Sequence, residues 1–324
     1  MTGFMRLDGL NHVPAALKGG VVAIGNFDGV HRGHQAVFER LRQEARTLGV
    51  PAIVLTFEPH PRDVFAPQPM MFRLTEADAK ARLAQALGLD AIVVMPFTRD
   101  FSQIEAEDFV ARFLVADLAV AGVIVGADFH FGRARRGTPD FLRAAGAQHG
   151  FGVTQLDLLD DGDEHVSSSR VRDALRQGDV DTANRLLGYH WFIEGVVEQG
   201  DQRGRELGYP TANIALPAQW GLAQGVYAVR ARVGETIHDG VASFGKPMFG
   251  DAPPPFESHL FDFSGDLYGQ SMAVALIGHV RGQARFGSLA DLVTAMDADS
   301  VRARQMLAAA RPLSGLDAAL GFVG

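Results

Sequence analysis

The chain contains no cysteine. Disulfides, thiol nucleophiles and thiolate metal sites are therefore excluded, and the composition suits a reducing compartment without requiring one. Long apolar runs are also missing, because the longest, residues 118–127, is far too short to cross a bilayer. Residues 1–20 lack the apolar stretch of a secretion signal. We expect a soluble protein of the cytoplasm that does not interact with membranes.

A basic surplus is missing as well: 30 lysines and arginines stand against 38 aspartates and glutamates, for a net charge of −8. Proteins that bind nucleic acid normally carry the opposite balance, so we expect no nucleic-acid partner. A small phosphorylated ligand in one local basic site is still compatible with this charge. The 324 residues favour two domains. A homo-oligomer is compatible with the sequence but not indicated by it.

The first half of the chain alternates apolar runs with amphipathic segments. This pattern predicts a Rossmann-like α/β domain, with an open parallel sheet covered by helices on both faces. The expected strands are 21–27, 52–57, 91–97, 121–129 and 152–159, and the expected helices are 35–49, 76–88, 105–118, 138–150 and 168–188. Ligands of such sheets bind beyond the carboxyl ends of the strands.

The sequence pattern changes after the last of these helices. Short alternating runs with frequent glycine turns predict a small antiparallel β-barrel, followed by a C-terminal helix over 288–310. The expected barrel strands are 192–200, 225–234, 236–245, 257–263 and 271–280. We place the domain boundary near 187, giving domains 1–187 and 188–324. The tail after the last helix suggests no structure.

The stretch GNFDGVHRGH, 25–34, stands between a buried strand and a helix. A helix N-terminus offers unpaired N–H groups and partial positive charge, so it binds phosphate readily. Gly25 and Gly29 allow a sharp turn and close approach to a ligand, while His31 and His34 can donate to phosphate oxygens. The spacing fits nucleotidyl transfer, in which a phosphate displaces pyrophosphate from ATP. A metal pair or two ordinary loop histidines are the alternatives.

Two other segments carry groups suited to phosphate. Ser167, Ser168 and Ser169 can cap the helix that follows, and Arg172 in its first turn can reach a leaving pyrophosphate. A plain capped helix with a solvated arginine explains the same residues. The arginines within 133–136 form a basic cluster that either neutralises phosphates or belongs to a solvated loop.

The second half contains one candidate metal site and one candidate base. Thr211 and Asn213 offer hard oxygen ligands two residues apart, on one face of an extended segment, after the rigid Pro210. Glu257 lies in an alternating run and can accept a proton from an attacking hydroxyl. The alternatives are that residues 210–213 form an ordinary turn and that Glu257 is a solvated glutamate on a strand.

Six segments, in this order, resemble the motifs of the prokaryotic bifunctional riboflavin kinase/FAD synthetases, which carry an HxGH nucleotidylyltransferase domain. The resemblance covers nearly the whole chain, and the order of the motifs makes it specific. The segments are GNFDGVHRGH at 25–34, TFEPHPRDVF at 56–65, VGADFHFGRARRG at 125–137, the helix start VSSSRVR at 166–172, GRELGYPTANI at 204–214 and FESHLFDFSGDLYGQ at 256–270.

The resemblance implies two steps: the barrel phosphorylates riboflavin with MgATP to give FMN, and the α/β domain transfers AMP from ATP to FMN to give FAD and pyrophosphate. It implies catalytic roles for His31, His34, Arg172 and Glu257, and Mg²⁺ ligation by Thr211 and Asn213. It implies ATP or phosphate contacts at Gly25, Asn26, Phe27, Asp28, Gly29, Ser168, Ser169, Gly204, Gly208 and Pro210, and flavin contacts at Phe57, Pro59, His60, Asp128, Phe129, Phe131 and Arg133.

Some of these assignments have plain structural alternatives. Phe129 and Phe131 can wall an isoalloxazine ring, or serve as core aromatics on a strand. His60 can equally be a packed, hydrogen-bonded histidine. Asn26 and Asp28 can position the triphosphate or its metal.

Two departures from the family pattern concern the kinase. Residues 243–250 read SFGKPMFG, with Ser243 where asparagine is usual and an altered, shortened Arg-Pro-Thr core, and residues 280–286 also differ. A single-activity FMN adenylyltransferase with an impaired kinase is therefore one alternative. A nucleotidylyltransferase with another acceptor and a flavin-binding regulator without turnover are the others.

Overall fold

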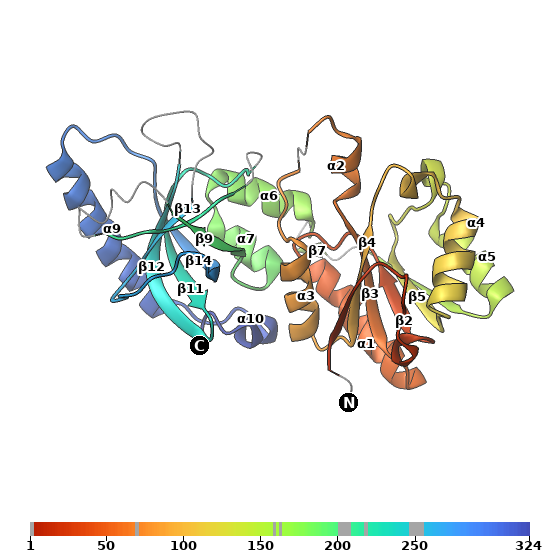
Figure 1. The fold of residues 1–324 in the computed structure, drawn as a ribbon. Helices are drawn as coiled ribbons and strands as arrows, with labels where there is room; N and C mark the ends of the chain where they lie inside the picture. The colour runs from red at the N-terminus through yellow and green to blue at the C-terminus, as the bar shows by residue number, and fades with distance from the viewer. Residues whose placement is uncertain are drawn as a thin grey trace. The chain divides into compact units, whose positions relative to one another are not determined.

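The computed structural model describes residues 3–68, 71–157, 160–161, 164–199, 209–216, 220–245 and 256–324. The chain divides into two compact units, Met1–Ser167 and Ser168–Gly324 (Figure 1).

The first unit is built on a six-stranded parallel sheet in the order β1-β4-β3-β2-β5-β6. Its strands are β1 (Met5–Asp8), β2 (Val21–Ile24), β3 (Ala52–Glu58), β4 (Ala91–Pro96), β5 (Gly122–Gly126) and β6 (Gly152–Leu156). Every residue of β2 is buried, so both faces of the central sheet are covered. The edge strand β1 is absent from the expected set because a run of four residues is about the shortest that a strand pattern can identify. In the structure its residues alternate between half-buried and exposed.

Helices follow the strands as the amphipathic pattern predicts. They are α1 (Arg32–Leu48), α2 (Pro61–Phe65), α3 (Ala77–Ala86), α4 (Ala106–Phe109), which continues as the π-helical η3 (Val110–Asp117), and α5 (Pro139–His149). Short 3₁₀ turns are η1 (Ala15–Leu17), η2 (Phe101–Gln103) and η4 (Arg133–Arg135), and β7 (Asp160–Asp161) pairs with β8 (Glu164–His165). The sequence pattern did not predict α2, because Pro59 before the helix and Pro61 at its first position suggested a stiff loop.

The second unit contains a closed antiparallel barrel in the order β10-β13-β12-β11-β14-β9 (Figure 1). The barrel strands are β9 (Phe192–Glu198), β10 (Ala212–Ile214), β11 (Gly225–Val233), β12 (Thr236–Phe244), β13 (Phe256–Leu260) and β14 (Ser271–Gly282). The helices of the second unit are α6 (Ser168–Gln177), α7 (Val180–Leu187), α9 (Leu289–Ala309) and α10 (Gly315–Leu320). The barrel and its C-terminal helix confirm the expected architecture.

Helices α6 and α7 pack with the barrel. Asn184 of α7 is buried, and its side-chain amide donates to the carbonyl of Leu276 at 3.0 Å while accepting from the backbone N–H of Trp191 at 2.9 Å. The carbonyl of Leu175 accepts from the backbone N–H of Ala223 at 2.9 Å. The compact units therefore divide before α6, and the assignment of residues 1–187 and 188–324 to separate activities stays a prediction.

The C-terminal tail is anchored by a buried polar pair. Asp317 in α10 accepts hydrogen bonds from Nδ1–H of His190 at 2.7 Å and from the backbone N–H of the same residue at 3.0 Å. Arg230 of β11 donates to the carbonyl oxygens of Leu307 at 2.9 Å and Phe322 at 3.2 Å. These contacts hold the C-terminal segment against the barrel, and the sequence did not indicate them.

Two candidate active sites

The loop between β2 and α1 occupies the switch point of the parallel sheet. Strand β2 pairs with β3 on one side and with β5 on the other, and the chain order reverses between these neighbours. Open α/β sheets bind ligands beyond the carboxyl ends of the strands at such a point. Residues 25–30 leave β2 at that end, so the topology places the GNFDGVHRGH motif where a ligand is expected.

A buried phenylalanine shapes this loop. Phe27 and Val30 have φ angles of 46° and 38°, unusual for residues with side chains, and Gly29 has a φ of 82°. The Phe27 ring lies 4.8 Å from the ring of Phe38, centre to centre. A Cβ on Gly25 would lie 2.9 Å from the Phe27 ring. Gly25 therefore makes room for this aromatic side chain, a reason that differs from the close ligand approach expected of it.

His31 and His34 lie together at the N-terminus of α1. Their rings stack with centres 3.6 Å apart and an interplanar angle of 19°. His31 is the N-cap residue, and its Nδ1 accepts a hydrogen bond from the backbone N–H of His34 at 3.4 Å. An accepting Nδ1 carries no proton, so the ring proton of neutral His31 is on Nε2. The cap thus selects the tautomer whose donor nitrogen is Nε2.

His34 is held in its neutral form. Its Nδ1 is buried and has no hydrogen-bond partner among the residues that the structure describes. Burial is the main cause that lowers the pKa of His34 well below its ordinary value, and electrostatic interactions with His31 and Lys80 act in the same direction. A neutral imidazole carries one N–H donor and one acceptor nitrogen.

Asn26 and Asp28 connect the loop to its surroundings. Asp28 is buried, and its carboxylate accepts from the backbone N–H groups of Leu74 at 3.1 Å and Thr75 at 3.0 Å. The hydroxyl of Thr75 in turn accepts from the backbone N–H of Gly29 at 2.8 Å. These bonds give Asp28 a structural task, and its predicted contact with the triphosphate or a metal stays a prediction.

Sequence reasoning missed a buried ion cluster that consists of Asp28, Glu58, Arg73 and Lys80. Arg73 donates to both oxygens of Glu58, at 2.6 and 2.8 Å, and its Nε lies 3.8 Å from Asp28. Lys80, 1% exposed, places Nζ 2.8 Å from Glu58. Burial alone would raise the pKa of Glu58, but Arg73 and Lys80 outweigh it and lower that pKa. No local pattern marks these residues, because they come from different segments.

The TFEPHP segment contributes an aromatic side chain and a helix cap. Phe57 is buried, with ring centres 5.9 Å from Phe97 and 6.0 Å from Phe101. His60 is buried too, and its Nδ1 accepts from the backbone N–H of Arg62 at 3.2 Å as the N-cap of α2. Pro59 precedes it directly. His60 is therefore a packed, hydrogen-bonded histidine, and flavin contact by this segment stays untested.

The GADFHFG segment brings its two phenylalanines together. The rings of Phe129 and Phe131 stack 5.6 Å apart at 17°, and Phe131 continues into the core against Phe109 at 5.2 Å. Phe131 is 7% exposed, whereas Asp128 is exposed and Arg133 pairs with the carboxylate of Glu105 at 2.8 Å. Phe131 thus packs as a core aromatic, while Phe129 presents the more accessible ring.

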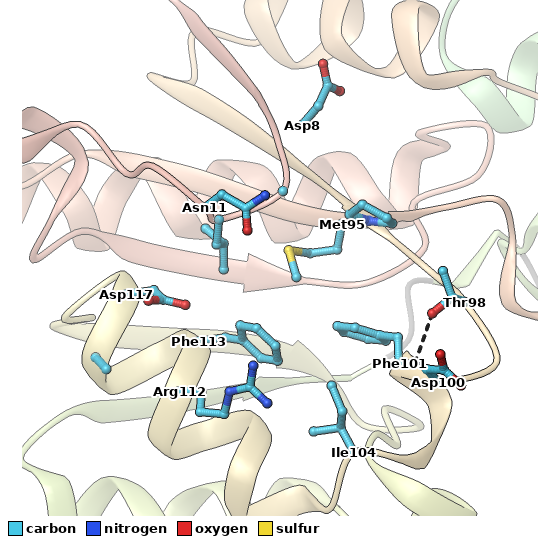
Figure 2. A pocket seen from close by; sticks show the side chains of 14 residues that line it. Asp8, Asn11, Met95, Thr98, Asp100, Phe101, Ile104, Arg112, Phe113 and Asp117 are labelled. Atoms are coloured by element: carbon cyan, nitrogen blue, oxygen red, sulfur yellow. Dashed lines mark hydrogen bonds between the residues drawn. The ribbon is translucent and has the colours of Figure 1, made fainter.

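A pocket of about 770 Å³ opens beyond the carboxyl ends of β1 and β4 (Figure 2). Figure 2 shows the side chains of Met95, Phe101 and Phe113 around it, with Arg112 extending beside Phe113. None of the residues predicted to bind flavin lines this pocket. It adjoins one of those residues all the same, because the ring of Phe101, which lines the pocket, lies 6.0 Å from the ring of Phe57, centre to centre.

The second candidate site lies on the outer face of the barrel. Asn213 of β10 and Glu257 of β13 are directly opposite in the antiparallel register, and Ser243 of β12 is opposite Glu257 on the other side. Asn213 and Glu257 are half-buried, while Ala212 and Ser258 face the interior. The Oδ1 atom of Asn213 is buried without a hydrogen-bond partner in the described part of the chain. The register thus unites a candidate ligand and a candidate base.

The remaining predicted residues of the second half have more limited placements. Thr211 precedes β10, and the carbonyl of Pro210 accepts from Nδ1–H of His259 at 2.9 Å. Gly204 and Gly208 lie outside the described residues, as do 246–250 of the altered segment.

Arg172, Ser168 and Ser169 belong to α6 of the second unit. Arg172 is buried, 6% exposed. Their predicted contacts with ATP stay predictions.

Two family models match the chain: FAD synthetase over residues 13–170 and riboflavin kinase over residues 187–307. A Pseudomonas fluorescens protein named bifunctional riboflavin kinase/FMN adenylyltransferase is 42% identical over 302 residues, 93% of this chain and 97% of the relative. The chain belongs to this family. Members from Escherichia coli K12 and Bacillus subtilis are 38% and 34% identical, over 92% and 87% of this chain and 96% and 91% of those proteins.

The family fold extends over nearly the whole chain in a solved structure too. A Streptococcus pneumoniae protein described as a macrolide-efflux protein superposes with a TM-score of 0.80 at 28% identity, covering 93% of this chain and 98% of that one. Within the described ranges of the present chain, no helix is long and apolar enough to cross a membrane. The family and fold class expected from the motifs are confirmed.

Proposed function

We propose that the chain makes FAD from riboflavin in two steps, with the barrel unit phosphorylating riboflavin and the parallel-sheet unit adenylylating the FMN so formed. The stacked pair His31 and His34 at the switch point carries the second assignment. The opposed pair Asn213 and Glu257 supports the first. Family membership supports both.

In the kinase step, Glu257 accepts the proton of the ribityl 5′-hydroxyl as its oxygen bonds to the γ-phosphorus of ATP. The bond between that phosphorus and the β–γ bridging oxygen breaks, and ADP leaves. Glu257 is half-buried on the face that also carries Asn213, so both can meet a substrate laid on the barrel.

Magnesium fits this face. Mg²⁺ prefers hard oxygen ligands and often takes one or two from protein and the rest from phosphates and water. The Oδ1 of Asn213 is such an oxygen, because it is buried and has no hydrogen-bond partner among the described residues, and Thr211 lies two residues before it. Bound there with ATP, the ion neutralises charge on the transferring phosphate. Among the described residues no cluster of three His, Asp or Glu side chains offers another site.

In the adenylylation step, an oxygen of the FMN phosphate bonds to the α-phosphorus of ATP, and pyrophosphate leaves. The protein forms no covalent bond, so its contribution is positioning and electrostatic stabilisation. His31 and His34 donate through Nε2–H to the α-phosphate and the leaving group, and Arg172 assists the departing pyrophosphate. Backbone groups of 25–29, with Ser168 and Ser169, complete the ATP contacts.

The flavin ring lies against the aromatic end of the first unit. Phe129 presents the more accessible ring of a stacked pair. Phe57 lies beside Phe101, which lines the pocket of Figure 2. Further flavin contacts are proposed for Pro59, His60, Asp128 and Arg133. Gly204, Gly208 and Pro210 serve ATP in the kinase unit.

Reciprocal variants test the two assignments. His31→Ala should abolish formation of FAD from supplied FMN and spare formation of FMN from riboflavin, while Glu257→Gln should do the reverse. Flavins separated by chromatography, with and without EDTA, provide the readout. Loss of both products in a folded His31→Ala variant would refute the separation of the steps. FAD from FMN but no FMN from riboflavin in the wild type would indicate an impaired kinase, with Ser243 beside Glu257 as the first position to examine.

The cytoplasmic location, the absence of nucleic-acid partners and the oligomeric state remain predictions from composition alone. Fractionation and sedimentation of the full chain with its substrates address them directly.

A further inference from the structure

The buried ion cluster is attached to the HxGH loop at both ends. Asp28 belongs to the loop, and it accepts from the backbone of Leu74 and Thr75. At the other end, the Thr56 hydroxyl donates to the carbonyl of Asn26 at 3.0 Å, and Lys80 Nζ lies 3.4 Å from that hydroxyl. The loop that presents the histidines is therefore bound to β3 and to the segment entering α3.

We propose that Lys80 is a positioning residue of the adenylylation site, acting through Glu58 and Thr56 on the loop and through its charge on His34. This inference rests on the proposed function of the first unit. Lys80 does not touch the reacting atoms. Its ammonium group is 1% exposed and is aimed into the cluster from α3.

The cluster is a costly way to stabilise a fold. Four charges leave water, and a well-packed apolar replacement is often as stable or more so. Asp28 and Glu58 balance Arg73 and Lys80, so the charge cancels inside. Asp28 is itself a residue of the loop, and Lys80 reaches the loop through the Thr56 hydroxyl, which donates to the carbonyl of Asn26. Positioning of the loop explains this arrangement better than stability does.

Lys80 also contributes to the charge state near the stacked rings. Burial, His31 and Lys80, in this order, lower the pKa of His34. Phe27 meets the His34 ring at 5.2 Å, edge to face, and contributes no charge. Among the described residues, His31 on the cap of the same helix and Lys80 from α3 are the titratable groups that act on His34. Burial is the largest of the three causes, and Lys80 adds to it in keeping His34 neutral.

Two variants separate positioning from simple charge balance. Lys80→Met keeps the shape of the side chain and removes its charge. The double variant Lys80→Met/Glu58→Gln removes both charges of one ion pair and leaves Asp28 and Arg73 to balance each other. We therefore expect it to fold even if the single variant does not. Lys18→Met, an exposed lysine of the same unit, is the matched control.

Three measurements are made on the full chain: kcat and KM for FAD formation from FMN, formation of FMN from riboflavin, and the titration of His34 followed by NMR of its ring protons. The kinase reaction is the internal control for folding of the second unit. Unfolding of the first unit is followed calorimetrically.

We expect kcat for FAD formation to fall about 10- to 100-fold in both Lys80 variants, as for a misplacement of catalytic groups by a fraction of an ångström to an ångström. KM for ATP should change far less, and the His34 titration should move to higher pH. The kinase reaction and Lys18→Met should match the wild type. Wild-type kcat and an unmoved titration in either folded variant would overturn the proposal, as would full restoration in the double variant. Failure of the wild type to form FAD from FMN would refute the proposed function instead.

Discussion

Replacing Asp317 with leucine removes an acceptor on which three donors depend, two of them buried. Asp317 is 0% exposed and accepts from the backbone N–H and the Nδ1–H of His190, at 3.0 and 2.7 Å, and from the backbone N–H of Leu313 at 2.9 Å. A buried donor without an acceptor costs about 1–3 kcal/mol. Because the three donors share one acceptor and relax together, we expect Asp317→Leu to cost about 3–5 kcal/mol.

The assay is calorimetric unfolding of the full chain. In a unit of this size each kcal/mol lowers the midpoint by roughly 2–4 °C, so the transition of the second unit should fall by roughly 6–20 °C. Added riboflavin and ATP identify that transition, because a ligand stabilises the unit that binds it. FMN formation should be lost at a correspondingly lower temperature, while FAD formation from FMN is spared.

The matched control is Asp181→Leu, an exposed aspartate on α7 of the same unit. Its loss should cost at most about 1 kcal/mol, the value of an acidic side chain in a first helical turn. Equal shifts in the two variants would refute the argument that buried hydrogen bonds to Asp317 hold the tail.

Acid provides a second view of the same group. Burial alone would raise the pKa of Asp317, but the hydrogen bonds from His190 and Leu313 outweigh it and lower that pKa. A carboxyl group with a lowered pKa stabilises the fold above its ordinary pKa of about 4, and the contribution disappears as pH falls through the folded-state value. The wild type should lose stability below about pH 4, and Asp317→Leu should lose less over that range.

Three further substitutions probe single contacts. His31→Asn keeps a good N-cap but removes the phosphate donor, so it should retain the wild-type melting midpoint while FAD formation falls at least about 100-fold; recovery of activity would reduce His31 to a capping role. Gly225→Ala places a Cβ 2.4 Å from the carbonyl oxygen of Arg281, so calorimetry should show a destabilised barrel and kinase assays an early loss on heating. Gly137→Ala places a Cβ 2.5 Å from the Phe131 ring, so KM for FMN should rise more than KM for ATP; equal changes would separate this ring from flavin binding.

Local patterns in the sequence determined most of the secondary structure and the position of both candidate sites. Apolar runs and amphipathic periods have short repeats, so they specify strands and helices without distant information. The motif GNFDGVHRGH combines a strand end, a turn and a helix cap within ten residues, and the structure does bring His31 and His34 together there. The period of two likewise predicts that Thr211 and Asn213 share one face, and this stays a prediction for Thr211, which precedes β10.

Tertiary structure decided what surrounds these motifs, because the partners are far apart in the chain. Glu58 meets Lys80 across 22 positions, and His190 meets Asp317 across 127. Gly25 and Phe27 are only two residues apart, yet their contact depends on how the buried Phe27 ring packs. Register alone set Asn213 opposite Glu257. Burial, charge compensation and strand pairing depend on the folded chain as a whole, and no local stretch encodes them.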